Sequence, residues 1–513
     1  MALDPKLLQS LPDTLVDLYG VVEIDILSDM ARRISTYDYF IPAALHQNQK
    51  LQELGMVQKD IIKRLSALTG QTQKELVELL SDASAESVED DIEYYTRADV
   101  YKPDKVDKEA LYAQLNSGLL QTEQAFFNIT KTTARTATKQ FERALDRAWL
   151  QISTGAFDYT AAIKSAITGL AEAGIGAIEY KSGKIDNIEV AVRRAVVTGA
   201  NQTSLKTQEV LADELEIDLV EVSAHGGARP EHAKWQGKVF SRNGRVTIDG
   251  VTYEDLRKAT GYGTGAGLGG WNCSHTFFPY VHGASRSWTD KELKALKEKK
   301  VTYNGKKYTE YEASQIQRGI EREIRKQKRT VAAIEAAGED ASAERTKLRK
   351  AQKSYTDFSE QTGMKKQSAR TMIATKKAER EVAKANKTAG VTPSTTKAIE
   401  KQREQIPKLD KIGKTDIIIS SRQYGKKIGK HARDYGLDPS KPTDRKIMDD
   451  KIADIIANKD DYAKGEWRGQ DGLCSFYIKG NDVVVVNANN EFVTIMEGGV
   501  NNVRVKKARG EKV

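Results

Sequence analysis

Apolar residues recur at helical spacing through most of the first 390 positions. The clearest case lies between positions 13 and 34, where they follow one another in steps of three or four: Leu15, Tyr19, Val22, Ile26 and Met30. Such spacing places them on one face of an α-helix. Similar patterns predict a long helix over 124–152 and a charged helical hairpin over 309–387 that turns near Gly338.

A second helix is expected to end near position 68, just before Gly70. Thr72 and Glu75 then have the spacing of a capping box, in which two side chains satisfy free backbone N–H groups at a helix start. The sequence therefore predicts a break at Gly70 and a new helix that begins at Thr72.

Shorter apolar runs between positions 178 and 253 favour β-strands. A small hairpin is expected over 178–185 and a single strand over 219–222. Asn243-Gly244 and Asp249-Gly250 are strong hairpin-turn signals between three further short strands, at 239–240, 246–248 and 251–253. This part of the chain is therefore predicted to be α+β.

The hydrophobic pattern changes after a linker over 389–397. Helices are predicted over 421–435 and 445–458, followed by four antiparallel strands over 473–479, 483–487, 491–496 and 500–506. The predicted fold class is a multidomain α+β protein that is mostly helical. Its C-terminal domain is predicted to consist of helices followed by an antiparallel sheet. Four parts are expected: a domain over 1–285, with its α+β segment over 219–282, a charged helical arm over 286–388, the linker, and a domain over 398–513.

Charge and cysteine content narrow the classes of partner. The 81 basic and 72 acidic residues give a net charge of +9, which favours acidic partners without proving that the chain binds nucleic acid. Cys273 and Cys474 lie in different regions, so we expect no disulfide and synthesis in a reducing compartment. No apolar run approaches the roughly 18 residues of a membrane span, and the N-terminus lacks a secretory signal pattern.

Unusual residue types converge between positions 223 and 282. Four of the six histidines are here, together with Cys273. If 272–278 is extended, Cys273 and His275 point to the same face, and a turn at 229–232 brings His232 over it. These three side chains, with His225 as a fourth, form a candidate zinc site. The alternative is a hydrogen-bonded core in which Cys273 acts as a small hydrophobic residue.

The glycine-rich stretch over 261–270 formally matches the dinucleotide-binding pattern GxGxxG. That fingerprint requires a strand before it and a helix after it, whereas the residues that follow read as extended. We therefore expect a tightly turning or mobile loop.

The motifs Arg-Pro-x-His (229–232), Gly-x-Val-Phe (237–240) and Gly-Trp-Asn-Cys-x-His (270–275) resemble those of tailed-phage minor head proteins. The chain is most similar to the phage minor capsid protein 2 family, related to the Mu F-like head morphogenesis proteins, over about 13–370. Those relatives commonly end the last motif with Cys-x-Cys, where this chain has His275. The resemblance implies a virion protein made in the bacterial cytoplasm, with portal and capsid proteins as partners.

The C-terminal domain resembles phage-associated nucleases of the barnase, EndoU, colicin and RelE types. A single histidine, His431, follows basic residues, and Arg468 lies in a Trp-Arg-Gly-Gln-Asp-Gly turn. Cleavage of RNA without a metal requires a proton-transferring group and cations on the phosphate. The candidates are His431 as general acid/base and Arg468 as phosphate clamp, with Tyr477 and Thr494 lining the sheet. The alternative is a surface histidine and a loop cation without catalytic roles.

Three functions are consistent with this sequence. The first is a structural protein of the phage head that carries an RNase-like effector acting on host RNA, and the second is a host-directed RNase toxin with a long delivery module. The weakest is a free metallohydrolase that uses the His–Cys residues with Glu231 as base. The basic residues of the helical arm suggest contact with viral DNA, although a solvated helical hairpin explains them equally.

Overall fold

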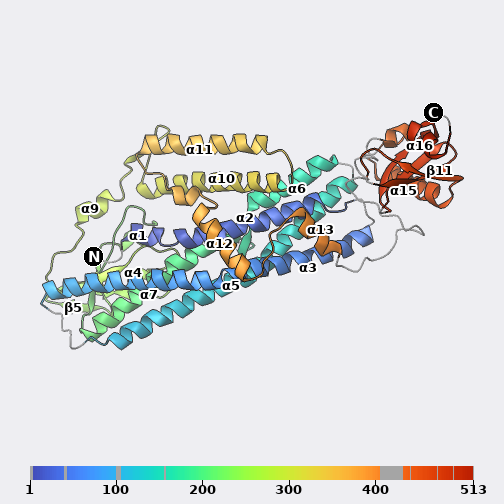
Figure 1. The fold of residues 1–513 in the computed structure, drawn as a ribbon. Helices are drawn as coiled ribbons and strands as arrows, with labels where there is room; N and C mark the ends of the chain where they lie inside the picture. Colours follow the sequence, from blue (N-terminus) through green and yellow to red (C-terminus); the bar gives the residue numbers. More distant parts are fainter. Residues whose placement is uncertain are drawn as a thin grey trace.

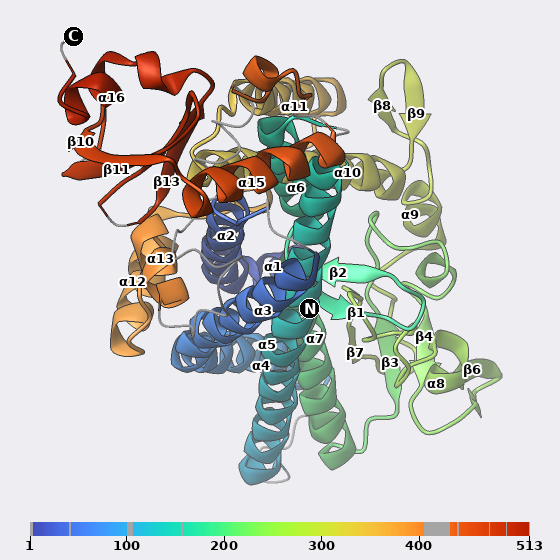
Figure 2. The ribbon, with the colours of Figure 1, turned by 90° about the vertical axis from the view of Figure 1, so that its right-hand side faces the viewer.

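The computed structural model describes residues 4–39, 43–99, 106–154, 157–404, 431–438, 441–470, 472–488 and 490–511. Figure 1 shows a long body of helices, with the C-terminal domain as a separate unit at one end. The view along the body in Figure 2 shows the strands β3 (Leu219–Val222), β4 (Val239–Ser241), β6 (Val251–Asp255) and β7 (Phe277–Pro279) beside the helices rather than between them.

The body is built on a bundle of helices whose apolar faces form one large core. Its members are α1 (Pro5–Ser10), α2 (Asp13–Ser35), α3 (Ala43–Ala67), α4 (Thr69–Arg97), α5 (Lys108–Ser153), α6 (Tyr159–Ala173) and α7 (Ile188–Glu214). The bounds of α2 confirm the helix predicted from position 13. The longest helix, α5, has 46 residues and begins well before the predicted position 124, because Asp107 caps it by accepting hydrogen bonds from the backbone N–H groups of Glu109 and Ala110.

The predicted helix break is present but lies at Leu68, between the end of α3 at Ala67 and the start of α4, and the predicted start at Thr72 is wrong. Helix α4 begins at Thr69, so Gly70 lies in its first turn. Thr72 caps nothing: its side chain is buried, and its hydroxyl lies 3.3 Å from the hydroxyl of Tyr19.

The predicted charged hairpin consists of α10 (Glu310–Ala336) and α11 (Ser342–Thr362), and it turns at Gly338 as expected. Helix α10 packs against α2 and α6 and contributes to the same core as the N-terminal helices. Two of its cations are therefore interior: Arg325 pairs with Glu189 at 2.9 Å, and Arg329 donates to the carbonyl of Ala171. The chain continues through α9 (Asp290–Ala295) before the hairpin, then α12 (Lys376–Thr388) and α13 (Thr396–Glu404) after it.

A five-stranded sheet lies beside the bundle, in the order β5-β6-β4-β3-β7. The turn at Asp249-Gly250 joins β5 and β6 as predicted. The Asn243-Gly244 turn closes no hairpin, because β4 pairs in parallel with β6 instead of with β5. The strands are β3 (Leu219–Val222), β4 (Val239–Ser241), β5 (Val246–Ile248), β6 (Val251–Asp255) and β7 (Phe277–Pro279), and separate hairpins are formed by β1 (Gly176–Glu179) with β2 (Ile185–Asn187) and by β8 (Val301–Tyr303) with β9 (Lys306–Tyr308).

The C-terminal domain is an antiparallel sheet in the order β10-β11-β12-β13, with an apolar core on each face. This confirms the α+β class. The predicted last strand over 500–506 is wrong: Asn502 caps a short helix there, and Val505 is buried against the sheet. The sequence pattern missed β10, which is rich in polar residues. The elements are α15 (Pro442–Ala457), β10 (Asp461–Glu466), β11 (Leu473–Lys479), β12 (Asp482–Val486), β13 (Phe492–Met496) and α16 (Val503–Ala508).

Candidate functional site

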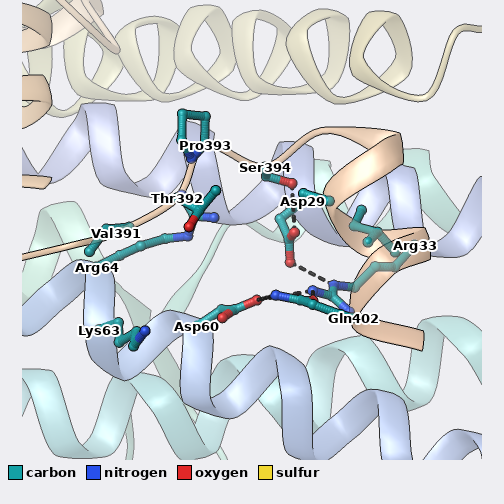
Figure 3. Close-up of a pocket in the computed structure, with 12 residues that line it drawn as sticks. Asp29, Arg33, Asp60, Lys63, Arg64, Val391, Thr392, Pro393, Ser394 and Gln402 are labelled. Atoms are coloured by element: carbon teal, nitrogen blue, oxygen red, sulfur yellow. Dashed lines mark hydrogen bonds and ion pairs between the residues drawn. The ribbon is translucent and has the colours of Figure 1, made fainter. Parts of the chain in front are cut away.

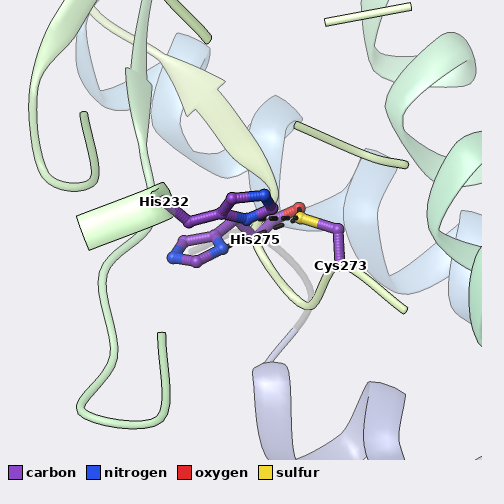
Figure 4. A group of neighbouring side chains, drawn as sticks. All are labelled: His232, Cys273 and His275. Carbon is purple, nitrogen blue, oxygen red and sulfur yellow. Dashed lines mark hydrogen bonds between the residues drawn. The ribbon is translucent and has the colours of Figure 1, made fainter. Parts of the chain in front are cut away.

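Three of the four predicted metal ligands converge beside the five-stranded sheet (Figure 4). His232 begins the 3-10 helix η2 (His232–Lys234), whose first backbone N–H donates to the carbonyl of Arg229. Cys273 and His275 lie in the segment that leads into β7. The site therefore joins two parts of the chain that are about 40 positions apart.

The strand predicted over 272–278 begins only at Phe277, which corrects the local geometry. Asn272 has a φ of 52°, so the chain turns sharply just before Cys273. The Cys273 backbone N–H donates to the carbonyl of Gly270, which holds the turn closed. Cys273 and His275 nevertheless face the same space, because they are two positions apart on the far side of the turn.

The ligand atoms of the three side chains lie close together and away from solvent. The Sγ atom of Cys273 is 3.6 Å from Nδ1 of His232 and 3.7 Å from Nδ1 of His275. All three side chains are buried, with 1 to 3% of their surface exposed. A sulfur and two imidazole nitrogens at this spacing match the donor types that bind Zn²⁺.

Gln236 fixes the protonation of the His275 ring. Its Oε1 accepts a hydrogen bond from the backbone N–H of His225 at 3.1 Å, which identifies this atom as the oxygen. The same oxygen lies 3.1 Å from Nε2 of His275, so Nε2 carries the ring proton. The Nδ1 atom of His275 therefore presents a lone pair to the sulfur.

The glycine-rich loop fixes the protonation of the His232 ring in the same way. The carbonyl of Ala266 lies 2.9 Å from Nε2 of His232, so that nitrogen is the donor, and Nδ1 again faces the sulfur with its lone pair. The Arg229 guanidinium, which can only donate, lies 3.2 Å from the same Nε2, so it cannot bond to that nitrogen while Nε2 donates to the closer carbonyl of Ala266; it donates instead to the carbonyl of Trp271. The loop needs glycine to close: a Cβ on Gly267 would lie 2.1 Å from the carbonyl oxygen of Gly261.

These assignments leave the cluster short of protons. Burial lowers the pKa of His232 and holds the pKa of His275 well below its usual range, so both rings are neutral near pH 7. Burial raises the pKa of the Cys273 thiol, which supplies at most one S–H proton. One proton cannot satisfy two facing lone pairs, whereas a cation between the three atoms would satisfy all of them.

His225, the fourth predicted ligand, lies next to the group of three rather than within it. Its ring centre is 4.4 Å from that of His275, and its Nε2 is buried without a hydrogen-bond partner among the described residues. Burial lowers the pKa of His225 to about 4. A buried ring nitrogen without a partner is costly and indicates a missing partner.

The predicted C-terminal residues do not form a comparable cluster. Nδ1 of His431 lies 2.8 Å from the Asp434 carboxylate, and within the described residues no hydrogen bond, ion pair or ring contact joins His431 to Arg468, Tyr477 or Thr494. Arg468 is exposed in the turn after β10. The basic segment before His431, with the first part of its predicted helix, lies outside the described residues.

Strand register separates two of these residues. Tyr477 lies opposite Val484, and Val484 opposite Ile495, so Tyr477 shares its face with the core that packs on α15. Thr494 lies opposite Val485 on the other face and is only 2% exposed. Their catalytic roles remain predictions.

Two contributors to the His–Cys cluster were missed in the sequence, the Gln236 side chain and the Ala266 carbonyl. A backbone carbonyl carries no residue signature, and a single glutamine is too common to stand out. The glycine-rich loop was the available signal, because its tight turns bring Ala266 onto His232.

Comparison with protein families gives a match over most of the chain. The family model described as "Phage minor capsid protein 2" matches residues 3–360, more than two-thirds of the chain. None of the curated proteins and none of the solved structures matches the chain. Within the described residues, no helix is both long enough and apolar enough to cross a membrane.

Proposed function

The chain belongs to the phage minor capsid protein 2 family, and on that premise we propose that it is a structural component of a tailed-phage head, placed next to the portal. The family match over 3–360 carries this proposal. Portal and capsid proteins are the proposed partners, and the virion is the proposed location after synthesis in the host cytoplasm.

Mass spectrometry of purified particles, with quantitation against the portal protein, tests the proposal. We expect a few copies per particle, and we expect deletion of the gene to give heads defective in assembly or genome delivery. Particles that lack the protein altogether would overturn it and would favour a host-directed toxin whose long N-terminal part serves delivery.

The His–Cys cluster is proposed to hold a structural zinc ion. His232, Cys273 and His275 fit the ion because two lone pairs and a thiol meet in a buried space, and His225 is the nearest candidate for a fourth ligand. A bound zinc would link η2 to the segment before β7. Elemental analysis of the purified protein should find close to one zinc per chain.

The C-terminal domain is proposed to cleave RNA without a metal. Two observations support this: the antiparallel sheet with α15 on one face, and His431 held 2.8 Å from a carboxylate that can orient its ring. In this proposal His431 transfers the proton and Arg468 holds the phosphate. The full-length chain should cut RNA in the presence of EDTA, and a chain that cuts no RNA and is harmless on expression would leave the domain a structural appendage.

Contact with viral DNA is proposed only for the outer face of the helical hairpin. The cations of α10 that pair inward cannot reach a partner, whereas α11 exposes Lys347, Arg349, Lys350 and Lys353, besides Arg345, which pairs with Glu335. Phosphate contacts would make binding fall steeply with salt. Binding that is independent of salt would argue against this contact.

A further inference from the structure

A buried network of charges lies where α2 and α3 meet the segment after α12 (Figure 3). Arg33 is fully buried in the middle of it. Its guanidinium donates to three carboxylates, those of Asp29, Glu53 and Asp60, at 2.9 to 3.1 Å. We call these three carboxylates with Arg33 the acidic socket.

Within α2 and α3, only Arg33 pairs with these carboxylates among the described residues. Lys63 and Arg64 also line the pocket, but Arg64 pairs with Asp25 at 3.9 Å instead. Three carboxylates surround one guanidinium, and Glu53 and Asp29 are 1% and 4% exposed. A buried carboxylate without a compensating cation is strongly destabilising. The socket formed by α2 and α3 therefore requires a second positive charge from elsewhere.

Helix α13 supplies that charge. Arg403 pairs with Glu53 through Nε and donates through Nη1 to the carbonyl of Thr36 at 2.9 Å. Its neighbour Gln402 closes the other side: the side-chain oxygen accepts from Arg33 at 2.6 Å, and the amide nitrogen donates to Asp60 at 3.2 Å.

The residues before α13 take part in the same contact. The hydroxyl of Ser394 donates to Asp29 at 2.6 Å, and Ile399 is an apolar anchor, 1% exposed. A segment predicted as a plain linker is thus bound to the helical body. Its binding depends on one apolar side chain and on hydrogen-bonded charges, which contribute little net energy when intact and cost much when one partner is removed.

We propose that residues 391–404 form a detachable clasp, an arginine-bearing helix held in the acidic socket of α2 and α3, and that this clasp limits how far the C-terminal domain can move from the helical body. When the clasp is bound, the connection to the C-terminal domain starts at the end of α13. Its release adds 14 residues to that connection, or up to about 50 Å of reach.

Hydrogen exchange of the full-length chain tests the clasp. In Arg403→Gln, Glu53 loses its second cation, so the amides of 399–404 should exchange on the order of 100-fold faster while those of α2 stay protected. The matched control is Lys401→Gln, which removes one charge from an exposed position of the same helix and should change exchange by less than about 3-fold.

A double substitution identifies the cause. In Glu53→Gln with Arg403→Gln, the uncompensated carboxylate is gone, so much of the protection lost in Arg403→Gln should return. Small-angle scattering should show a larger maximum dimension for Arg403→Gln than for the wild type. Unchanged exchange in Arg403→Gln would overturn the role of the socket, and a parallel rise in α2 and α13 would show that α13 is a fixed part of the bundle.

Discussion

The His–Cys cluster and the C-terminal domain each contain a set of polar residues that the sequence predicts to act together, and the structure treats the two sets differently. Three members of the first set bring their ligand atoms within 4.8 Å of one another. In the second set, His431 contacts its near neighbour Asp434, and register places Tyr477 and Thr494 on opposite faces of the sheet. The first set contains a pair only two positions apart, Cys273 and His275, which stays together despite an error in secondary structure, whereas the second set is spread over elements whose register decides which residues meet.

Removing the sulfur should have the largest effect. If the cluster binds zinc as proposed, Cys273→Ser should lose the metal and lower the free energy of unfolding by more than about 3 kcal/mol, because a closed zinc site contributes directly to folding. Elemental analysis and chemical denaturation measure both quantities.

The matched control is Cys474→Ser, since Cys474 is also fully buried but packs in an apolar core with Phe476 and Val485. This variant should keep the metal, and its free energy of unfolding should fall only by the cost of burying a hydroxyl in an apolar core. Wild-type protein free of metal at full stability would leave the cluster a hydrogen-bonded core.

The second-largest effect is expected from His431 in the C-terminal domain. If the C-terminal domain cleaves RNA, His431→Ala should reduce the cleavage rate on the order of 100- to 10,000-fold, the usual contribution of a general acid or base. Circular dichroism should show that the domain stays folded, because His431 lies at the start of a short 3-10 helix rather than in a core. Full activity in this variant would refute the choice of catalyst without refuting the nuclease proposal.

A smaller effect is expected from the group that orients His275. Gln236→Leu removes the shared acceptor of the His275 ring and the His225 backbone, so zinc affinity should fall about 10- to 100-fold. Competition with a chelator measures the affinity. Gln202→Leu is the control, because Gln202 also contacts the loop, through the carbonyl of Gly269, but touches none of the ligands.

The smallest effect is expected at Thr494. Its hydroxyl is buried on the face away from Tyr477, so Thr494→Val should change RNA cleavage by less than about 3-fold and stability by about 1 kcal/mol. Cleavage and thermal unfolding can be measured on one preparation. A loss as large as that expected for His431→Ala would show that the hydroxyl reaches the substrate and that the two sets are more alike than the register indicates.

Local patterns predicted the elements whose signals are local. Helix α2 and the turn at Gly338 follow directly from apolar spacing and from a glycine between two periodic segments. The capping-box spacing misplaced the start of α4 by three positions, because the buried Thr72 hydroxyl lies against Tyr19 instead of capping the helix. The apolar residues between 500 and 506 suit a strand or a helix, and the cap at Asn502 selects the helix.

The candidate site, too, was predictable only where its signal was local. His232, Cys273 and His275 were identified because rare residue types stood close together in the sequence. The clasp was not, because Arg33 and Gln402 are 369 positions apart and nothing in either segment indicates the other.

The length of α5 has a consequence for assembly. An α-helix rises 1.5 Å per residue, so its 46 residues make a rod of roughly 70 Å that runs along the body (Figure 1). Charges interact over about 8 Å at physiological ionic strength, so neither end of such a rod can sense the other electrostatically. The helix therefore keeps its two ends at a fixed distance from each other. If a ring of subunits binds one end of each copy of this protein, the opposite ends of all copies lie at one common radius.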